Sequence, residues 1–278
     1  MSEDQLFAAV QRSIAEGEME RAAAQVGAIA AERDGDPFTL LKCASLLLAI
    51  GDATASDDLL DKVMDALPAE EDKRLSLAAA LRSMGREQAA LDILDALEGR
   101  SALWHEERAR SLLALERGEE ALEPLDALPD GAVARRLRAE ALSQAGDDAA
   151  AMEVLDQLIL DFGNDYAALL QKVSLMIKSG NPKEAVRYVD SLLKADRRSA
   201  DLLALKAAAM QRSGKVLAAV NHARRALKQD ERHAGALETL AVALLERGKT
   251  TEAKIMAGAI SECDPGNPAA VRILRACI

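Results

Sequence analysis

Residue types that commonly perform catalysis are sparse in this chain and are not grouped. Its histidines are His105, His222 and His233, and none has a histidine, cysteine or carboxylate four positions away, as a metal site on one helix face needs. No phosphate-binding loop of the GxGxxG or GxxxxGK[ST] type occurs. We therefore expect no metal and no cofactor. His222 falls on an alanine-rich helix face, where a packed histidine is expected instead of a base.

The acidic pairs in the sequence do not suggest acid–base chemistry either. Asp57-Asp58, Glu70-Glu71 and Asp147-Asp148 are direct neighbours. Neighbouring side chains on a helix point about 100° apart, so the two carboxylates of each pair cannot converge on one substrate. Such pairs are typical of solvated or helix-capping charges. We expect that the protein is not an enzyme.

The cysteines and the N-terminus bear on the compartment. Cys43, Cys263 and Cys277 are odd in number and form no CxxC motif, which favours free thiols in a reducing compartment. The first residues are acidic and lack the basic and apolar regions of a signal peptide. The longest nearly apolar run, residues 44–50, is too short to cross a bilayer. We expect a cytoplasmic protein without membrane insertion.

Charge is distributed unevenly along the chain. Residues 1–131 hold 28 acidic and 13 basic side chains, a formal net charge of −15, whereas residues 132–278 hold 18 and 22, a net charge of +4. An acidic first half argues against nucleic acid as a partner, because nucleic-acid binding needs a basic surface. The asymmetry is consistent either with steering of a protein partner or with a drift of surface charge along a repeat.

A repeat of about 34 residues organises the chain. Apolar residues on both sides of each repeated glycine follow helical spacing, as in Leu237, Leu240, Ala241 and Leu244. A glycine at such a place predicts the end of a first helix in a left-handed conformation, and the polar Asp52, Asp147 and Asn181 predict the start of the next helix. The repeated glycines are Gly17, Gly51, Gly85, Gly118, Gly146, Gly180, Gly214 and Gly248.

With each glycine as position 15 of 34, the sequence resembles the tetratricopeptide repeat family over almost its whole length. Position 8 holds Val10, Ala44, Ala78, Ala139, Val173, Ala207 and Ala241, and position 20 holds Ala22, Ser56, Ala90, Ala151, Ala185, Ala219 and Ala253. The family's Asp-Pro ending is present as Asp264-Pro265. The resemblance implies an all-α fold: a right-handed α-α superhelix of about eight helix-turn-helix repeats within residues 1–278, plus a C-terminal capping helix.

The fourth repeat departs from the pattern. If Gly118 is position 15, Glu107 and Arg110 fall on packing positions, whereas a start at Ala102 puts Ala121 at position 20 and moves the turn by two residues. Pro124 falls within the short second helix and removes a hydrogen bond from it. The pattern predicts a kink at 117–131 that separates residues 1–131 from 132–278, unless local repacking absorbs the deletion.

The end of the sequence indicates one more helix. Pro268 to Ile278 has the pattern of a first helix, and we expect Val271, Leu274 and Ile278 to face inward. Arg272 and Arg275 give the outer face the polarity of a cap. A self-association surface or a truncation point are the alternatives.

The resemblance also implies a ligand groove, lined by positions 2, 5, 9, 12 and 13 of the first helices. An apolar front and a basic centre favour a peptide with apolar anchors and acidic residues. Alternatively, Arg82, Lys178 and Arg212 are cations that helix C-termini favour. The front would hold Phe7, Gln11, Ile14, Phe38, Leu41, Ser45 and Leu48, and the rest Arg82, Arg136, Glu140, Gln144, Gln171, Ser174, Lys178, Gln211 and Arg212, with Arg108 or Arg110 depending on register.

The sequence thus predicts a bacterial, non-enzymatic adaptor that binds a protein or peptide in its concave groove. Two alternatives remain open. One is a structural scaffold that self-assembles through its terminal faces, and the other is the targeting region of a larger enzyme or secretion component.

Overall fold

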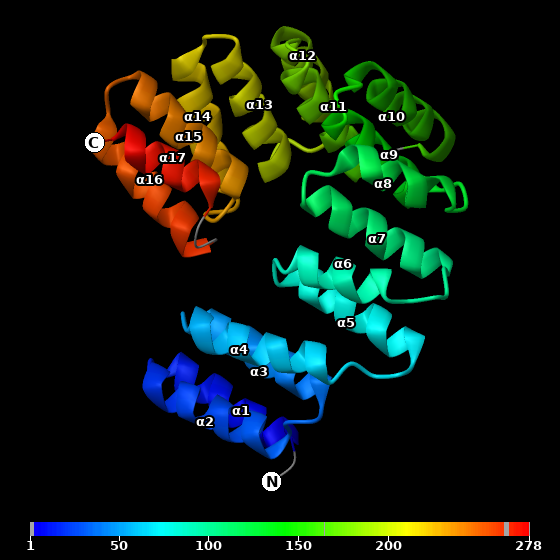
Figure 1. Cartoon of the computed structure of the whole chain (residues 1–278). Helices are drawn as coiled ribbons and strands as arrows, with labels where there is room; N and C mark the ends of the chain where they lie inside the picture. Colours follow the sequence, from blue (N-terminus) through cyan, green and yellow to red (C-terminus); the bar gives the residue numbers. More distant parts are fainter. Residues whose placement is uncertain (1–2, 164, 264–266, 278) are drawn as a thin grey trace. The chain divides into compact units, whose positions relative to one another are not determined.

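The computed structural model describes residues 3–163, 165–263 and 267–277. Across these residues the chain forms 17 α-helices and no strand, which confirms the predicted all-α repeat fold (Figure 1). The chain divides into two compact units, Met1–Pro129 and Asp130–Ile278. Each unit holds four helix pairs in its described part, and the second unit holds one helix more.

The helices alternate with short turns in both units. The first unit contains α1 (Glu3–Ala15), α2 (Met19–Glu32), α3 (Pro37–Ala49), α4 (Ala53–Asp65), α5 (Glu71–Ser83), α6 (Glu87–Asp95), α7 (Ala102–Ala114) and α8 (Gly118–Asp126). The second contains α9 (Ala132–Gln144), α10 (Asp148–Phe162), α11 (Tyr166–Lys178), α12 (Pro182–Leu192), α13 (Ala200–Arg212), α14 (Val216–Leu227), α15 (Ala234–Glu246), α16 (Thr250–Cys263) and α17 (Pro268–Ala276).

Odd-numbered helices pack on one another as well as on their even-numbered neighbours. Within the second unit, α13 packs against α14 of its own pair and against both α11 and α15. The first helices of successive pairs therefore form one layer, in which the same repeat positions recur side by side.

Small side chains fill the contacts between paired helices. Every residue named above at positions 8 and 20 is at most 1% exposed. In the second pair the Ser56 hydroxyl donates a 2.9 Å hydrogen bond to the backbone oxygen of Ala44, which joins position 20 to position 8 directly. Such close approach of two helices leaves no room for a longer side chain, so these positions explain why alanine is so abundant.

The glycine assignment is confirmed in seven pairs and wrong in one. Seven of the repeated glycines have φ between 72° and 89°, but Gly118 instead begins α8. The left-handed residue of the fourth pair is Glu116, with φ of 58°. This is the register that starts at Ala102, and Ala109 and Ala121 are accordingly fully buried at positions 8 and 20.

The backbone of Glu116 is therefore strained, because a residue with a Cβ is disfavoured in the left-handed region. The glycines at the same position of the other pairs carry no such strain. We expect Glu116→Gly to raise the free energy of unfolding by about 1 kcal/mol, and Gly85→Ala, at φ of 74°, to lower it by a similar amount. Thermal unfolding of the two variants beside the wild type measures both changes. A Glu116→Gly variant that is less stable than the wild type would contradict the strain assigned to this turn.

At two of the three predicted helix starts, the side chain of the predicted residue caps the helix. The carboxylates of Asp52 and Asp147 accept hydrogen bonds from the backbone nitrogens of Ala55 and Ala150, at 3.1 Å and 2.9 Å. Asn181 precedes α12 but makes no such side-chain bond. The helix begins at Pro182, whose fixed φ suits the first turn.

Pro124 lies inside α8 and is buried. The sequence-predicted kink at 117–131 stays a prediction, and the boundary between the two compact units falls after Pro129, within that segment.

The prediction for the last helix is wrong in its orientation. Val271 and Leu274 are 39% and 37% exposed, and the buried face of α17 instead carries Ala270 and Ile273. Their counterparts 34 residues earlier, Leu237 and Leu240, are buried in one cluster with Ala253 and Ala257 of α16. No described helix follows α17 to cover Val271 and Leu274 in the same way. The prediction for Ile278 lies outside the described residues.

Candidate peptide-binding groove

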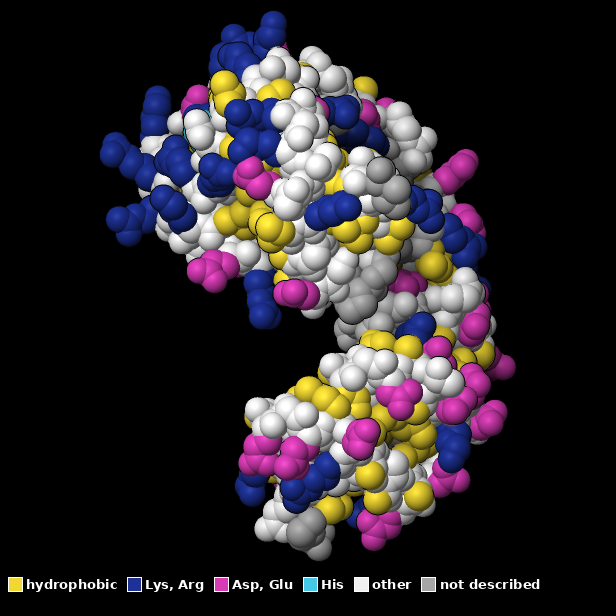
Figure 2. Space-filling view, turned by 90° about the vertical axis from the view of Figure 1, so that its left-hand side faces the viewer, with side chains coloured by type: hydrophobic (Ala, Val, Ile, Leu, Met, Phe, Trp, Pro, Cys, Tyr) yellow, Lys and Arg dark blue, Asp and Glu magenta, His cyan; other side chains and the backbone are white. Residues whose placement is uncertain are grey.

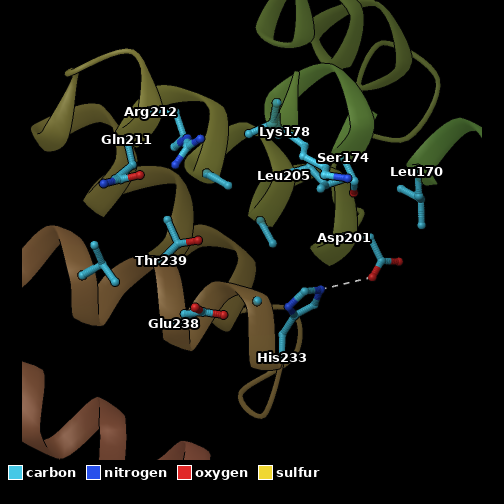
Figure 3. A pocket seen from close by; sticks show the side chains of 15 residues that line it. Leu170, Ser174, Lys178, Asp201, Leu205, Gln211, Arg212, His233, Glu238 and Thr239 are labelled. Carbon is cyan, nitrogen blue, oxygen red and sulfur yellow. Dashed lines mark hydrogen bonds and ion pairs between the residues drawn. The ribbon is translucent and has the colours of Figure 1, made fainter. Parts of the chain in front are cut away.

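Three first helices of the second unit, α11, α13 and α15, enclose a groove with a volume of about 520 Å³ (Figure 3). Most of its lining falls on repeat positions 2, 5, 9, 12 and 13, the positions that the resemblance implied. The lining residues are Leu170, Ser174, Ile177, Lys178, Asp201, Ala204, Leu205, Ala208, Gln211, Arg212, His233, Gly235, Glu238, Thr239 and Val242.

The floor of the groove is apolar. Leu205 and Ala208 of α13 lie between Leu170 on one side and Val242 on the other, and each of these four side chains is only partly buried. Contact with a ligand can therefore remove further apolar surface from water, at about 25 cal/mol per Å².

Cations lie at the edge formed by the ends of α11 and α13. Lys178 is held in place by Ser143, whose hydroxyl accepts a 2.8 Å hydrogen bond, and by an ion pair of 3.1 Å with Asp148. Burial alone would raise the pKa of Asp148, but hydrogen bonds from Lys178, Ser179 and Ser143 together hold it below the ordinary value. Arg212 is exposed and has no hydrogen bond or ion pair within the described residues. Arg212 is thus available to an anionic group.

The opposite edge is formed by the starts of α13 and α15. His233 caps α15, because its Nδ1 accepts a hydrogen bond from the backbone nitrogen of Ala236 at 3.2 Å. Its Nε2 therefore carries the proton and donates to the Asp201 carboxylate at 3.1 Å (Figure 3). This pair fixes both side chains, so the groove is bounded by a neutral or acidic edge facing the edge with Lys178 and Arg212.

The sequence-predicted residues of the second unit divide into two sets. Ser174, Lys178, Gln211 and Arg212 line the groove. The others do not: the Gln171 amide donates a 3.0 Å hydrogen bond to the backbone oxygen of Arg136, and Arg136 pairs with Asp165 at 3.6 Å. Together these contacts join α9 to α11. Glu140 and Gln144 lie exposed on α9, outside the groove lining.

The residues predicted for the first unit differ in their exposure. Phe38 and Leu48 are about two-fifths exposed, at 41% and 38%, and Ser45 is exposed. Leu41 and Phe7 are buried, at 6% and 3%, so their side chains pack inside the unit and offer little surface to a ligand. Gln11 is exposed and Ile14 is half-buried.

Arg82 serves the fold of the first unit. Its Nε donates a 3.1 Å hydrogen bond to Glu107, whose side chain is only 11% exposed. A carboxylate so far from water needs a paired cation. Arg110 likewise pairs with Glu106 at 2.7 Å, and Arg108 with Asp95 at 3.0 Å. These arginines are engaged by carboxylates of their own unit.

The sequence prediction named four of the fifteen residues that line the groove and missed the others. Asp201, Glu238 and Val242 lie on α13 and α15 at repeat positions 2, 5 and 9, which the resemblance implied, and Thr239 lies at position 6. Applying the same positions to the last two pairs would have found all but Thr239. His233 gave no such signal, since it precedes its helix.

The described residues contain no group of three or more His, Cys, Asp or Glu arranged to hold a metal ion. His222 on α14 is half-buried, and burial lowers its pKa below the ordinary value. None of the helices described is both long and apolar enough to span a membrane.

Comparisons with known proteins support the repeat fold. Residues 211–277 match the model of the tetratricopeptide repeat family. A tetratricopeptide repeat protein from Parabacteroides merdae has the same fold with a TM-score of 0.67, at 19% identity over 87% of this chain and 98% of its own. Yeast Tom70 follows with a TM-score of 0.62, at 13% identity over 95% of this chain and 58% of its own.

Human IFIT1, solved as a dimer with PPP-AAAA, has a TM-score of 0.53 at 15% identity, over 90% of this chain and 66% of its own. No curated protein sequence matches the chain. Because the identities are low, these likenesses establish the fold and leave the ligand to be argued from the groove.

Proposed function

We propose that this chain, a tetratricopeptide repeat protein, is a non-enzymatic adaptor that binds a peptide segment of a partner protein in the groove of α11, α13 and α15. Proteins of this family are generally protein-interaction scaffolds and generally not enzymes. The observation that carries the proposal is the lining of the groove: an apolar floor beside Arg212, an exposed cation without a partner in the described chain.

The lining specifies the chemistry of the segment. The floor around Leu205 and Val242 suits an aliphatic or aromatic anchor, and Arg212 suits a carboxylate placed beside it. Ser174 and Thr239 offer hydroxyl groups to the peptide backbone. The proposed ligand is therefore a short segment that combines an apolar anchor with an acidic residue.

The fold alone does not select this class of ligand, since the structurally similar human IFIT1 was solved with PPP-AAAA. A peptide is favoured here because the apolar side chains of the groove would add nothing to binding a phosphate backbone. These side chains, all partly or fully buried, are Leu170, Ile177, Ala204, Leu205, Ala208 and Val242.

Self-association is the second candidate, and α17 supplies the observation for it. Val271 and Leu274 form an exposed apolar strip on this helix. A second copy could cover the strip in the way that the next helix of a pair covers the equivalent positions elsewhere. Light scattering over a range of concentrations tests this candidate, and a strict monomer at high concentration excludes it.

Selection from a displayed random-peptide library on the full chain tests the proposed function. We expect enrichment of peptides that contain an acidic residue next to an apolar one. Binding should be lost on an Ala208→Arg variant, because the longer side chain fills the floor of the groove. The matched control is Ala149→Arg, at an exposed position of α10 outside the groove. Absence of any enriched peptide, or equal binding to both variants, argues against the groove.

A further inference from the structure

Four basic side chains surround a second hollow of the second unit. Lys and Arg side chains gather on the face of this unit that Figure 2 shows, in keeping with the net charge of +4 over residues 132–278. The hollow has a volume of about 410 Å³. It is lined by Arg197, Arg198, Leu203, Arg225, Lys228 and Gln229. Among these lining residues none is acidic.

Two separate segments bring the cations together. Arg197 and Arg198 lie in the loop that precedes α13, and Arg225 and Lys228 lie in the last turn and at the C-terminal cap of α14. Because α13 and α14 pack side by side in a helix-turn-helix pair, the start of α13 lies next to the end of α14. The hollow is therefore part of the folded frame of one helix pair.

The four cations lack partners. Within the described residues, their side chains make no hydrogen bond or ion pair, whereas Arg224 on the same helix pairs with Glu252 at 3.2 Å. The nearby carboxylates of Asp196 and Asp230 bond to backbone nitrogens and form no ion pair with these four side chains. Asp196 accepts a 3.1 Å hydrogen bond from the backbone nitrogen of Arg198, and Asp230 accepts one of 3.0 Å from the backbone nitrogen of Arg232. A bound anion would therefore relieve the repulsion among these four cations.

Helix dipoles account for only half of this cluster. The C-terminal end of α14 attracts cations such as Arg225 and Lys228. Arg197 and Arg198, however, precede the N-terminal end of α13, where the dipole disfavours positive charge. Since the two dipoles oppose each other, the side-chain charges determine the sign of the local potential.

Repeat packing does not require these residues either. For Arg197 and Arg225 the residues 34 positions before and after are uncharged or acidic, whereas Arg198 is matched by Arg232 and Lys228 by Lys194. The uncharged or acidic residues are Gly163 and Glu231 for Arg197, and Ser191 and Ala259 for Arg225. The complete set of four cations is thus found in this helix pair and not in the two adjacent pairs.

We propose that the hollow binds a compact soluble anion that carries two or more linked phosphate groups. Each of the three guanidinium groups can donate two parallel hydrogen bonds to phosphate oxygens, and the Lys228 ammonium adds a point charge. Four positive charges match a phosphate chain better than a single carboxylate. Leu203, the one apolar residue in the described lining, is only 2% exposed, so a peptide would find no apolar contact here.

Isothermal titration of the full chain with sodium tripolyphosphate tests this site, which is independent of the peptide groove. We expect saturable binding that is at least tenfold weaker in the double variant Arg198→Gln with Arg225→Gln. The control is Lys215→Gln with Lys254→Gln, which removes the same charge at exposed positions outside the hollow and should bind as the wild type does. All four substituted residues are exposed, so folding should be preserved, as circular dichroism will show.

Further titrations separate the sources of phosphate. ATP that binds as tightly as tripolyphosphate shows that the phosphate chain alone is recognised, and ATP that binds more tightly identifies a nucleotide; both support the site. Sulfate of equal affinity at matched ionic strength overturns it, and so does an equal loss of affinity in both double variants. Binding of poly(U) RNA without binding of tripolyphosphate overturns it in favour of nucleic acid.

Discussion

Trp104→Ala should lower the free energy of local unfolding of α6 and α7 by about 3–5 kcal/mol, the range for truncating a buried tryptophan. Trp104 is 3% exposed, and its Nε1 donates a 2.8 Å hydrogen bond to the backbone oxygen of Leu94. This bond connects α7 to the end of α6. Removal of the indole leaves both a cavity and a buried carbonyl oxygen with one hydrogen bond fewer.

Native-state hydrogen exchange is the suitable measurement, because it reports the two helices without assuming that the two compact units unfold together. Trp104→Phe should cost about 1–3 kcal/mol, since it keeps most of the packing and loses the hydrogen bond. Leu217→Ala serves as the control, because Leu217 is 63% exposed and its truncation should change protection by less than about 0.5 kcal/mol. Unchanged protection in Trp104→Ala would show that this contact does not hold the helices together.

Arg212→Glu should weaken binding of the selected peptides by about tenfold to a hundredfold. The substitution removes a charge-assisted hydrogen bond and places a like charge next to the carboxylate of the peptide. The effect should shrink for peptides whose acidic residue is replaced by glutamine, because only the charged pair depends on Arg212. Fluorescence polarisation with labelled peptides measures both affinities.

Lys254→Glu is the matched control for that reversal. Lys254 is exposed on α16, outside the groove lining, and its reversal changes the net charge equally. If Lys254→Glu weakens binding as much as Arg212→Glu, the attraction comes from the overall field of the chain and not from the groove.

The repeat was predictable because its packing is local and periodic. Small residues at positions 8 and 20 have one physical function in every pair, so their spacing alone locates the helices. The pattern failed where a different residue performs the same function. Glu116 takes the left-handed conformation without being a glycine, and Gly118, which looked like the turn residue, begins a helix.

The sequence pattern predicted several repeat positions that line the groove. It did not predict which cations are paired with a carboxylate. Sequence spacing places Arg82, Arg136 and Lys178 on first helices, but their partners come from elsewhere in the chain. Glu107, Asp165 and Asp148 lie 25, 29 and 30 residues away from them, respectively. Only the structure distinguishes these engaged cations from Arg212, which stays free to bind.

The orientation of α17 failed for a related reason. The inward face of a first helix depends on which neighbours cover it, and Val271 and Leu274 are placed to contact a second helix. The sequence pattern shows that these residues can be buried. Whether a neighbour is there to bury them is a property of the tertiary structure.

Photo-crosslinking mapped by mass spectrometry tests the central claim most directly. A selected peptide that carries a benzophenone at its apolar anchor would be irradiated with the full chain. We predict crosslinks to the groove floor on α11, α13 and α15, at Leu170, Leu205 and Val242 above all, and their loss in Ala208→Arg. Crosslinks confined to the even-numbered helices α12, α14 and α16, or to the first unit, would contradict the assignment of the peptide site to this groove.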